Sequence, residues 1–208
     1  MSGDWRRPGW SNPAAWYTLA GFVLLGVSLW MPWLAASRTA RVELRGDELA
    51  AALCDAAGEV AGTVGIDALD EGDRRVLLAR FLMRAACRGA YVADIERLEP
   101  APAGIVLALR NRHYAFQVTA SPPAANERSG PRAVDAYEVT AWPLRRGGPA
   151  HCAFFYPENA ARAYTRNLRA SYAGFDGRPA PGSSHRRQDA DRNPTNYSSF
   201  DGELWIQY

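Results

Sequence analysis

The apolar stretch Trp16–Ala36 reads WYTLAGFVLLGVSLWMPWLAA and decides the architecture of the chain. No charged residue lies between Arg7 and Arg38. As an α-helix this stretch would be about 31 Å long, which matches a hydrocarbon core of roughly 30 Å. Backbone polar groups inside lipid must be satisfied within the segment, so it has to be helical. The sequence therefore predicts one transmembrane helix over residues 16–37.

Aromatic residues at both ends of this stretch support the same prediction. Trp16 and Tyr17 lie at one end and Trp30 and Trp33 at the other, where amphipathic rings favour the headgroup region. The alternative is a secretory signal peptide cleaved near residues 34–37. The apolar core of a signal peptide is shorter, about 7–15 residues, and the chain retains its initiator methionine. We therefore expect an uncleaved anchor.

The flanking charges give a topology prediction. Arg6 and Arg7 precede the span, and Arg38, Arg41 and Arg45 follow it, so counting bases alone gives near parity. Acidic residues offset the downstream bases, and long domains translocate largely regardless of charge. We expect a single-pass protein of a bacterial inner (cytoplasmic) membrane, with a cytoplasmic amino terminus and the large domain on the periplasmic side. The odd number of cysteines favours the opposite topology, because an unpaired thiol suits the reducing side of the membrane.

Two helices are predicted after the span. Leu49, Leu53 and Ala57 recur at helical spacing, in a segment that continues the membrane helix or follows a break at Gly46. For the second helix, Asp70 or Asp73 can provide the cap, and Arg88-Gly89 suits the exit. Its apolar stripe consists of Leu77, Leu78, Phe81, Leu82 and Ala85.

From about Gly104 the hydrophobic period changes from helix to strand. Runs at 104–109, 114–119, 137–142 and 152–156 alternate or are short and apolar. Consecutive strands joined by short loops favour an antiparallel sheet, with the preceding helix covering one face. The predicted fold class is α+β.

The last 35 residues have a different composition. Residues 174–196 are rich in Gly, Pro, Ser, Arg and Asp and lack periodicity, whereas the chain ends on the apolar Leu204–Tyr208. We expect an extended tail that docks on a neighbouring molecule. The predicted organisation is a cytoplasmic segment 1–15, a transmembrane helix 16–37, an α+β domain 38–173 and an extended tail 174–208.

Two short motifs resemble type IV pilins and pseudopilins. The run Gly21–Val27 resembles their processing and assembly motif, a Gly-Phe followed by apolar residues, and Phe154–Arg162 is similar to their late strand-turn-strand. The resemblance implies a membrane helix running into an amphipathic helix packed on an antiparallel sheet, and a pilin-like domain over 38–173. However, Gly26 occupies the place where an assembling pilin carries Glu, and no base directly precedes Gly21. These departures imply that the filament-forming chemistry is lost.

Little in the sequence indicates catalysis. The net charge of +2 is too small for a nucleic-acid binder, and no nucleotide-binding, zinc-protease or serine-hydrolase motif is present. The imidazoles are His113, His151 and His185; His151 adjoins Cys152, but neighbours on a strand point to opposite faces. We assign no catalytic residue.

No cofactor or metal site is predicted either. The acidic clusters at 70–73 and 189–191 lack the spacing of a calcium loop. Cys54 and Cys87 suit buried thiols, or a disulfide if the two helices pack together outside the cell. No histidine lies in the span, so this helix would not ligate haem or pigment itself, although its aromatic rings could pack against pigments held by neighbours.

These features favour a non-enzymatic accessory subunit of a large membrane complex, with respiratory or photosynthetic electron-transfer assemblies as the preferred host. Its expected partners are the bilayer and other subunits of the complex, and not nucleic acid. The alternatives are a pilin-like component of a secretion or filament machine, and an unrecognised hydrolase or binding module. The expected partner-contact residues are Trp16, Tyr17, Gly21, Gly26, Trp30, Trp33, Trp205 and Tyr208.

Overall fold

The structure is a computed structural model and describes residues 13–99, 104–120, 137–158, 161–169, 171–185 and 195–208. By its internal contacts the chain falls into two compact units, Met1–Arg38 and Thr39–Tyr208. The segment 1–12, the whole loop 121–136, and the acidic cluster at 189–191 lie outside the described residues.

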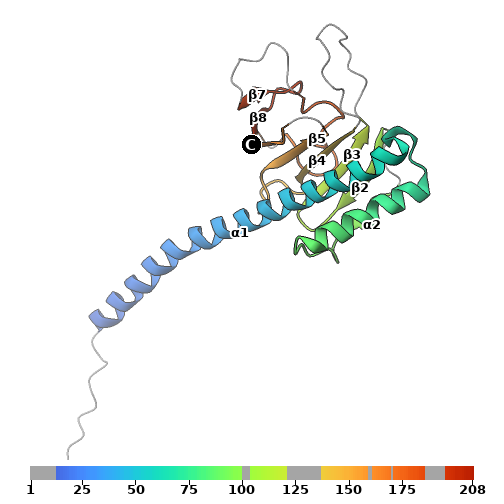
Figure 1. Ribbon diagram of the computed structural model, residues 1–208. Coiled ribbons are helices and arrows are strands. Elements are labelled where there is room, and N and C mark those ends of the chain that lie inside the picture. Colours follow the sequence, from blue (N-terminus) through green and yellow to red (C-terminus); the bar gives the residue numbers. More distant parts are fainter. Residues whose placement is uncertain (1–12, 100–103, 121–136, 159–160, 170, 186–194) are drawn as a thin grey trace, which may run out of the picture. The chain divides into compact units, whose positions relative to one another are not determined.

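One long helix begins the described chain. Helix α1 extends over Pro13–Val64 without a break at Gly46 (Figure 1). Its carboxyl-terminal half places Leu49, Leu53 and Ala57 in the core of the second unit, as their helical spacing predicts. The structure confirms the predicted helix. Of the two predicted alternatives, a helix that continues through Gly46 and a break at that residue, the structure shows the continuous helix.

Gly46 allows a close approach between α1 and the sheet. A Cβ atom at Gly46 would lie 2.5 Å from Cε2 of the Tyr114 ring, and one at Gly58 would lie 2.8 Å from Oη of Tyr137. Real Cβ atoms do not approach other heavy atoms so closely, and Tyr114 is fully buried, so its ring has little room to move. The glycine therefore serves packing and does not end the helix.

The second helix begins and ends where its capping residues predict. Helix α2 spans Glu71–Cys87, after the short 3-10 helix η1 (Ile66–Ala68). The Asp70 carboxylate accepts a hydrogen bond from the Asp73 N–H (2.8 Å), and the Asp73 carboxylate accepts one from the Asp70 N–H (3.2 Å). This reciprocal capping box gives acceptors to two backbone N–H groups that have no acceptor within the helix. At the other end Arg88 is the C-cap residue, and Gly89 adopts a φ of 75° that suits glycine.

An antiparallel sheet forms the rest of the second unit. Its strand order is β1-β2-β3-β4-β5-β6-β8-β7, and every neighbouring pair is antiparallel. The strand bounds are β1 Glu96–Arg97, β2 Ile105–Arg110, β3 Tyr114–Ala120, β4 Tyr137–Pro143, β5 Ala153–Pro157, β6 Ala163–Thr165, β7 Asn196–Ser198 and β8 Leu204–Gln207. The α+β class and the four strands β2–β5 are therefore confirmed.

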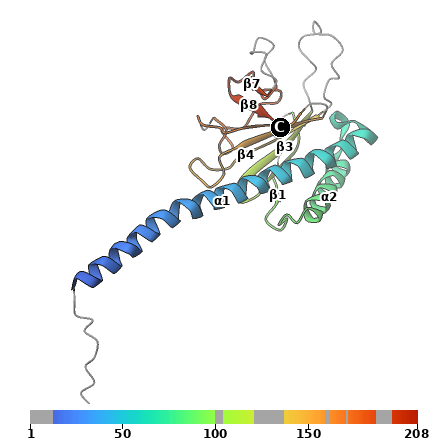
Figure 2. The ribbon, with the colours of Figure 1, turned by 60° about the vertical axis from the view of Figure 1, so that its left-hand side comes forward.

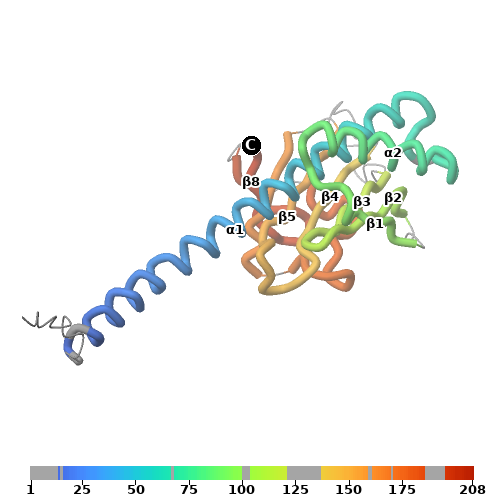
Figure 3. Tube along the Cα trace, turned by 90° about the horizontal axis from the view of Figure 1, so that it is seen from below, coloured from blue at the N-terminus to red at the C-terminus, as the bar shows by residue number. Residues whose placement is uncertain are grey.

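The sheet is covered on both faces. Figures 1 to 3 show α2 beside the carboxyl-terminal half of α1, and these two helices pack on one face. The residues that the sheet contributes to this first core include Leu107, Phe116, Val118, Val139 and Phe154. On the other face Trp142 and Phe155 form a second core with Tyr172, Tyr197 and Trp205 from the end of the chain.

The end of the chain differs from the extended tail expected over residues 174–208. Residues 204–207 form β8, which pairs with β6 and with β7, and Trp205 is fully buried. Tyr197 and Trp205 cover apolar residues on the second face of the sheet and remove that surface from water, which offsets the entropy lost on ordering the chain. This segment therefore docks on its own sheet.

Candidate functional site

The amino-terminal part of α1 is the most unusual surface of the described chain. All side chains from Trp16 to Ala36 are exposed, although nearly all are apolar. By length and composition, this part makes α1 the one described helix that could cross a membrane. An exposed apolar surface of this size needs lipid or other protein around it. This helix surface is the candidate site.

Aromatic residues mark the two ends of the site. Trp16 and Tyr17 are exposed near the start of α1, and Trp30 and Trp33 are exposed near residue 36. The rings of Trp30 and Trp33 lie 6.1 Å apart and tilted, so they form one aromatic cluster. Residues 16 and 30 are separated by about 21 Å along the helix axis. Such rings favour the interfaces of a bilayer, and their separation here is shorter than a hydrocarbon core of roughly 30 Å.

Two glycines leave small surfaces between the aromatic ends. Apart from the adjoining residues and the nearby backbone of α1 itself, no described atom lies within 4 Å of the position that a Cβ would occupy at Gly21 or Gly26. Five helical residues correspond to a rotation of about 140°, so the two glycines lie on different faces. Gly26 lies on the same stripe as Trp30 and Trp33, at i+4 and i+7. Each glycine can admit the close approach of another helix.

The two remaining expected contact residues lie at the end of the chain. Trp205 is fully buried, and its Nε1 donates to Ser199 Oγ at 3.2 Å. It therefore has no exposed surface with which to contact a partner, contrary to the expectation. Tyr208 is half exposed and donates a hydrogen bond from its hydroxyl to Asp47 Oδ1, to which Tyr156 also donates. Burial and the Asp47 carboxylate raise the pKa of both phenols. Tyr208 thus attaches the end of the chain to α1.

The three histidines lie in different surroundings in the described chain. The backbone N–H groups of His151 and Cys152 both donate to Glu43 Oε1 at 3.3 Å; His151 is exposed and Cys152 is half-buried. Burial and Glu43 raise the pKa of Cys152 to about 12, so the thiol stays protonated. Burial and Arg112 lower the pKa of His113.

His185 takes part in a buried polar cluster that the sequence did not predict. Its Nε2 lies 2.8 Å from Oε2 of Glu138, a carboxylate that is 1% exposed. The other oxygen, Oε1, accepts hydrogen bonds from Thr119 Oγ1 (3.1 Å) and Gly182 N–H (2.7 Å). Glu138 alternates with Tyr137 and Val139, which is the pattern of a residue facing water. The alternation of apolar and polar residues could not show that the end of the chain covers the face of the sheet on which Glu138 lies.

The described residues hold no cluster of three or more His, Cys, Asp or Glu side chains that could bind a metal ion. Cys54, Cys87 and Cys152 are free thiols, so the alternative of a Cys54–Cys87 disulfide is not formed.

The chain was compared with protein-family models, curated proteins and solved structures, and none of them matches it. The pilin-like resemblance of Gly21–Val27 and Phe154–Arg162 therefore stays a prediction.

Proposed function

We propose that the protein is a non-enzymatic, membrane-anchored subunit of a larger membrane complex. The first part of α1 would cross the bilayer and pack on helices of its partners. The α+β domain would stand at the membrane surface, on the periplasmic side if the charge-based topology is correct. A respiratory or photosynthetic electron-transfer complex is the host to test first, because such complexes often contain single-span subunits.

One observation carries this proposal: the exposed, uncharged surface of residues 16–36 in α1. In water it would cost about 25 cal/mol for each Å² of apolar area that is left uncovered. The second unit has two complete cores of its own, so its folding does not require this surface. Lipid and neighbouring helices are the environments that suit it.

Membrane insertion is tested with Leu25→Arg, close to the centre of the stretch. An arginine there should cost about 2.5–3.5 kcal/mol of insertion free energy, so less protein should resist extraction of membranes with alkaline carbonate. Ser37→Arg adds the same charge at the end of the stretch and should stay in the membrane. If the Leu25→Arg and wild-type proteins resist extraction equally, this stretch is not the anchor.

Partner binding is tested with the double variant Gly21→Leu/Gly26→Leu. It fills both small surfaces with apolar side chains, so we expect normal insertion but a several-fold loss of co-migration with a larger complex in mild detergent. Val23→Leu/Val27→Leu keeps both glycines and should co-migrate like wild type. A wild-type chain that migrates alone, or a double glycine variant that keeps its partners, would contradict helix packing as the basis of assembly.

A pilin-like component is the second candidate, favoured by a specific observation. Helix α1 is a single helix of 52 residues that is apolar in its first part and packs on an antiparallel sheet in its last part, as the resemblance implies. Its test is the mature amino terminus, read by mass spectrometry of the protein from native membranes. A chain that begins at Phe22 favours this candidate, whereas an intact chain favours the accessory subunit.

A further inference from the structure

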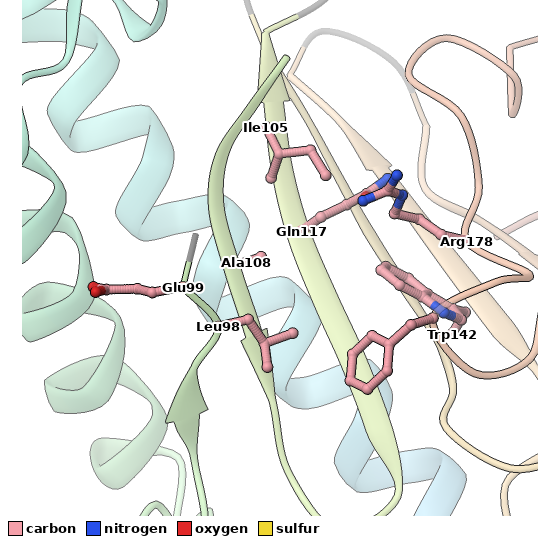
Figure 4. A pocket seen from close by; sticks show the side chains of 8 residues that line it. Leu98, Glu99, Ile105, Ala108, Gln117, Trp142 and Arg178 are labelled. Carbon is pink, nitrogen blue, oxygen red and sulfur yellow. The ribbon is translucent and has the colours of Figure 1, made fainter. Parts of the chain in front are cut away.

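A hollow of about 300 Å³ lies on the second face of the sheet (Figure 4). Strands β2, β3 and β4 provide its floor, and the segment that follows Tyr172 provides one wall. Its size is at the lower end of the range for small-molecule sites. The residues that line it are Leu98, Glu99, Ile105, Ala108, Gln117, Trp142, Phe175 and Arg178.

The walls of the hollow are mainly apolar and partly rigid. The indole Nε1 of Trp142 donates a hydrogen bond to the Gly174 carbonyl at 2.8 Å, which fixes the ring against the wall. Phe175 is half exposed at the rim, and Ala108 is small and buried in the floor. A flat apolar group between Trp142 and Phe175 would gain stacking on an aromatic surface.

The floor contains a polar atom that lacks a partner. Gln117 is fully buried, and its Nε2 donates to the Pro179 carbonyl at 2.9 Å. Because that carbonyl can only accept, it fixes the orientation of the amide and leaves Oε1 as an acceptor. Among the described residues, Oε1 has no hydrogen-bond partner. Leaving a buried acceptor without a donor is unfavourable, so a ligand donor that reaches Oε1 would be favourable.

The rim is positively charged. Arg178 is exposed, and no carboxylate in the described part of the chain forms an ion pair with it. Glu99, the acidic residue of the lining, is paired with Arg97 at 3.0 Å, and its carboxylate points away from the other lining residues in Figure 4. Arg178 therefore favours an anionic group on a ligand.

We propose that this hollow binds a small, flat, apolar acid that also carries one N–H or O–H donor. The apolar body would lie between Trp142 and Phe175, the donor would reach Gln117 Oε1, and the carboxylate would face Arg178. Because Oε1 is shielded from water, the proposal requires exposed side chains at the rim, such as Phe175, to shift so that the donor can reach this atom. The site is independent of the proposed membrane function.

Indole-3-acetate is the probe, because it combines a flat apolar ring, one N–H donor and a carboxylate. Equilibrium dialysis against the full-length protein in detergent should show saturable binding of one molecule per chain. The probe 1-methylindole-3-acetate lacks the donor, and indole-3-acetamide lacks the charge. Each should bind at least several-fold more weakly.

Two variants locate the binding. Ala108→Phe fills the hollow and should reduce binding at least tenfold, and Arg178→Gln should reduce it several-fold. Arg169→Gln removes an exposed arginine outside the lining and should leave binding unchanged. The proposal is overturned if indole-3-acetate does not saturate, if the three probes bind equally, or if a folded Ala108→Phe protein binds like wild type. Should Ala108→Phe fail to fold, unchanged binding by Arg178→Gln overturns it.

Discussion

Glu138 shows how one side chain can connect distant parts of the second unit. Its carboxylate is fully buried on β4, and it accepts hydrogen bonds from Thr119 on β3 and from the Gly182 N–H near the end of the chain. His185 contacts the same carboxylate. A buried polar group is costly unless it is hydrogen-bonded, so the burial of Glu138 depends on these contacts.

Replacing Glu138 by Ala should lower the free energy of unfolding by about 1–3 kcal/mol, because the buried Thr119 hydroxyl and the part-buried Gly182 N–H would lose their acceptor. The measurement is the midpoint of urea unfolding. Glu96→Ala removes an exposed carboxylate that is paired with Arg110 at 2.5 Å, and it should cost no more than about 1 kcal/mol. Equal losses in the two variants would contradict this account of the cluster.

The half-buried thiols lead to a pH-dependent prediction. Burial and Asp55 raise the pKa of Cys54 to about 11 from an ordinary value of 9.0. The thiolate is the reactive form, so at pH 8 this shift should slow alkylation roughly a hundredfold, and the rate should rise about tenfold for each pH unit up to pH 11.

Mass spectrometry after brief treatment with iodoacetamide at pH 8 should therefore find the exposed Cys87 labelled before Cys54 and Cys152. Urea should make all three thiols reactive, which serves as the control. Labelling of Cys54 as fast as Cys87 in the folded protein would be the contrary result.

At the scale of elements, the packing of α1 on the sheet depends on Gly46. An alanine Cβ there would overlap the buried Tyr114 ring, so we expect Gly46→Ala to destabilise the protein by about 1–3 kcal/mol. Gly62→Ala lies on the same helix with open space around it, and it should stabilise by up to about 1 kcal/mol through helix propensity. In thermal unfolding, the midpoint should therefore fall for Gly46→Ala and rise for Gly62→Ala relative to wild type.

The helices and β2–β5 could be predicted because each carries a local signal. Asp70 caps α2, and Tyr114, Phe116 and Val118 alternate along β3. Strands β6, β7 and β8 have only three or four residues each and lack such a signal. Their pairing depends on contacts between distant parts of the chain, such as Trp205 with Phe155, at a ring distance of 5.9 Å.

The exposed apolar part of α1 could be predicted from the sequence, whereas the polar groups on the second face of the sheet could not. The exposed apolar residues of α1 follow from hydropathy alone, so Trp16 to Trp33 lie on the helix surface where we expected them. The Glu138 cluster and the hollow beside Gln117 were missed, because a period of two shows which residues share a face and not what covers it.

At the scale of the whole molecule, both cores lie within residues 39–208. We therefore expect a fragment of residues 39–208 to be soluble without detergent and to unfold in a single cooperative transition. Its thermal midpoint should lie within a few degrees of that of the domain in the full chain. A fragment that aggregates or melts without cooperativity would show that the first 38 residues contribute to folding.

The strand order also affects how neighbouring copies can meet. The two outermost strands of the described sheet, β1 and β7, are only two and three residues long. Strand β7 is short and offers an incoming strand few free backbone groups, whereas β1 pairs only with Leu109 and Arg110 and leaves the Ile105–Leu107 part of β2 as an open edge of the described sheet. In the proposed membrane-anchored state, sheet-to-sheet contact between neighbouring copies would therefore be confined to this short stretch of β2, and most lateral association would fall to the first part of α1.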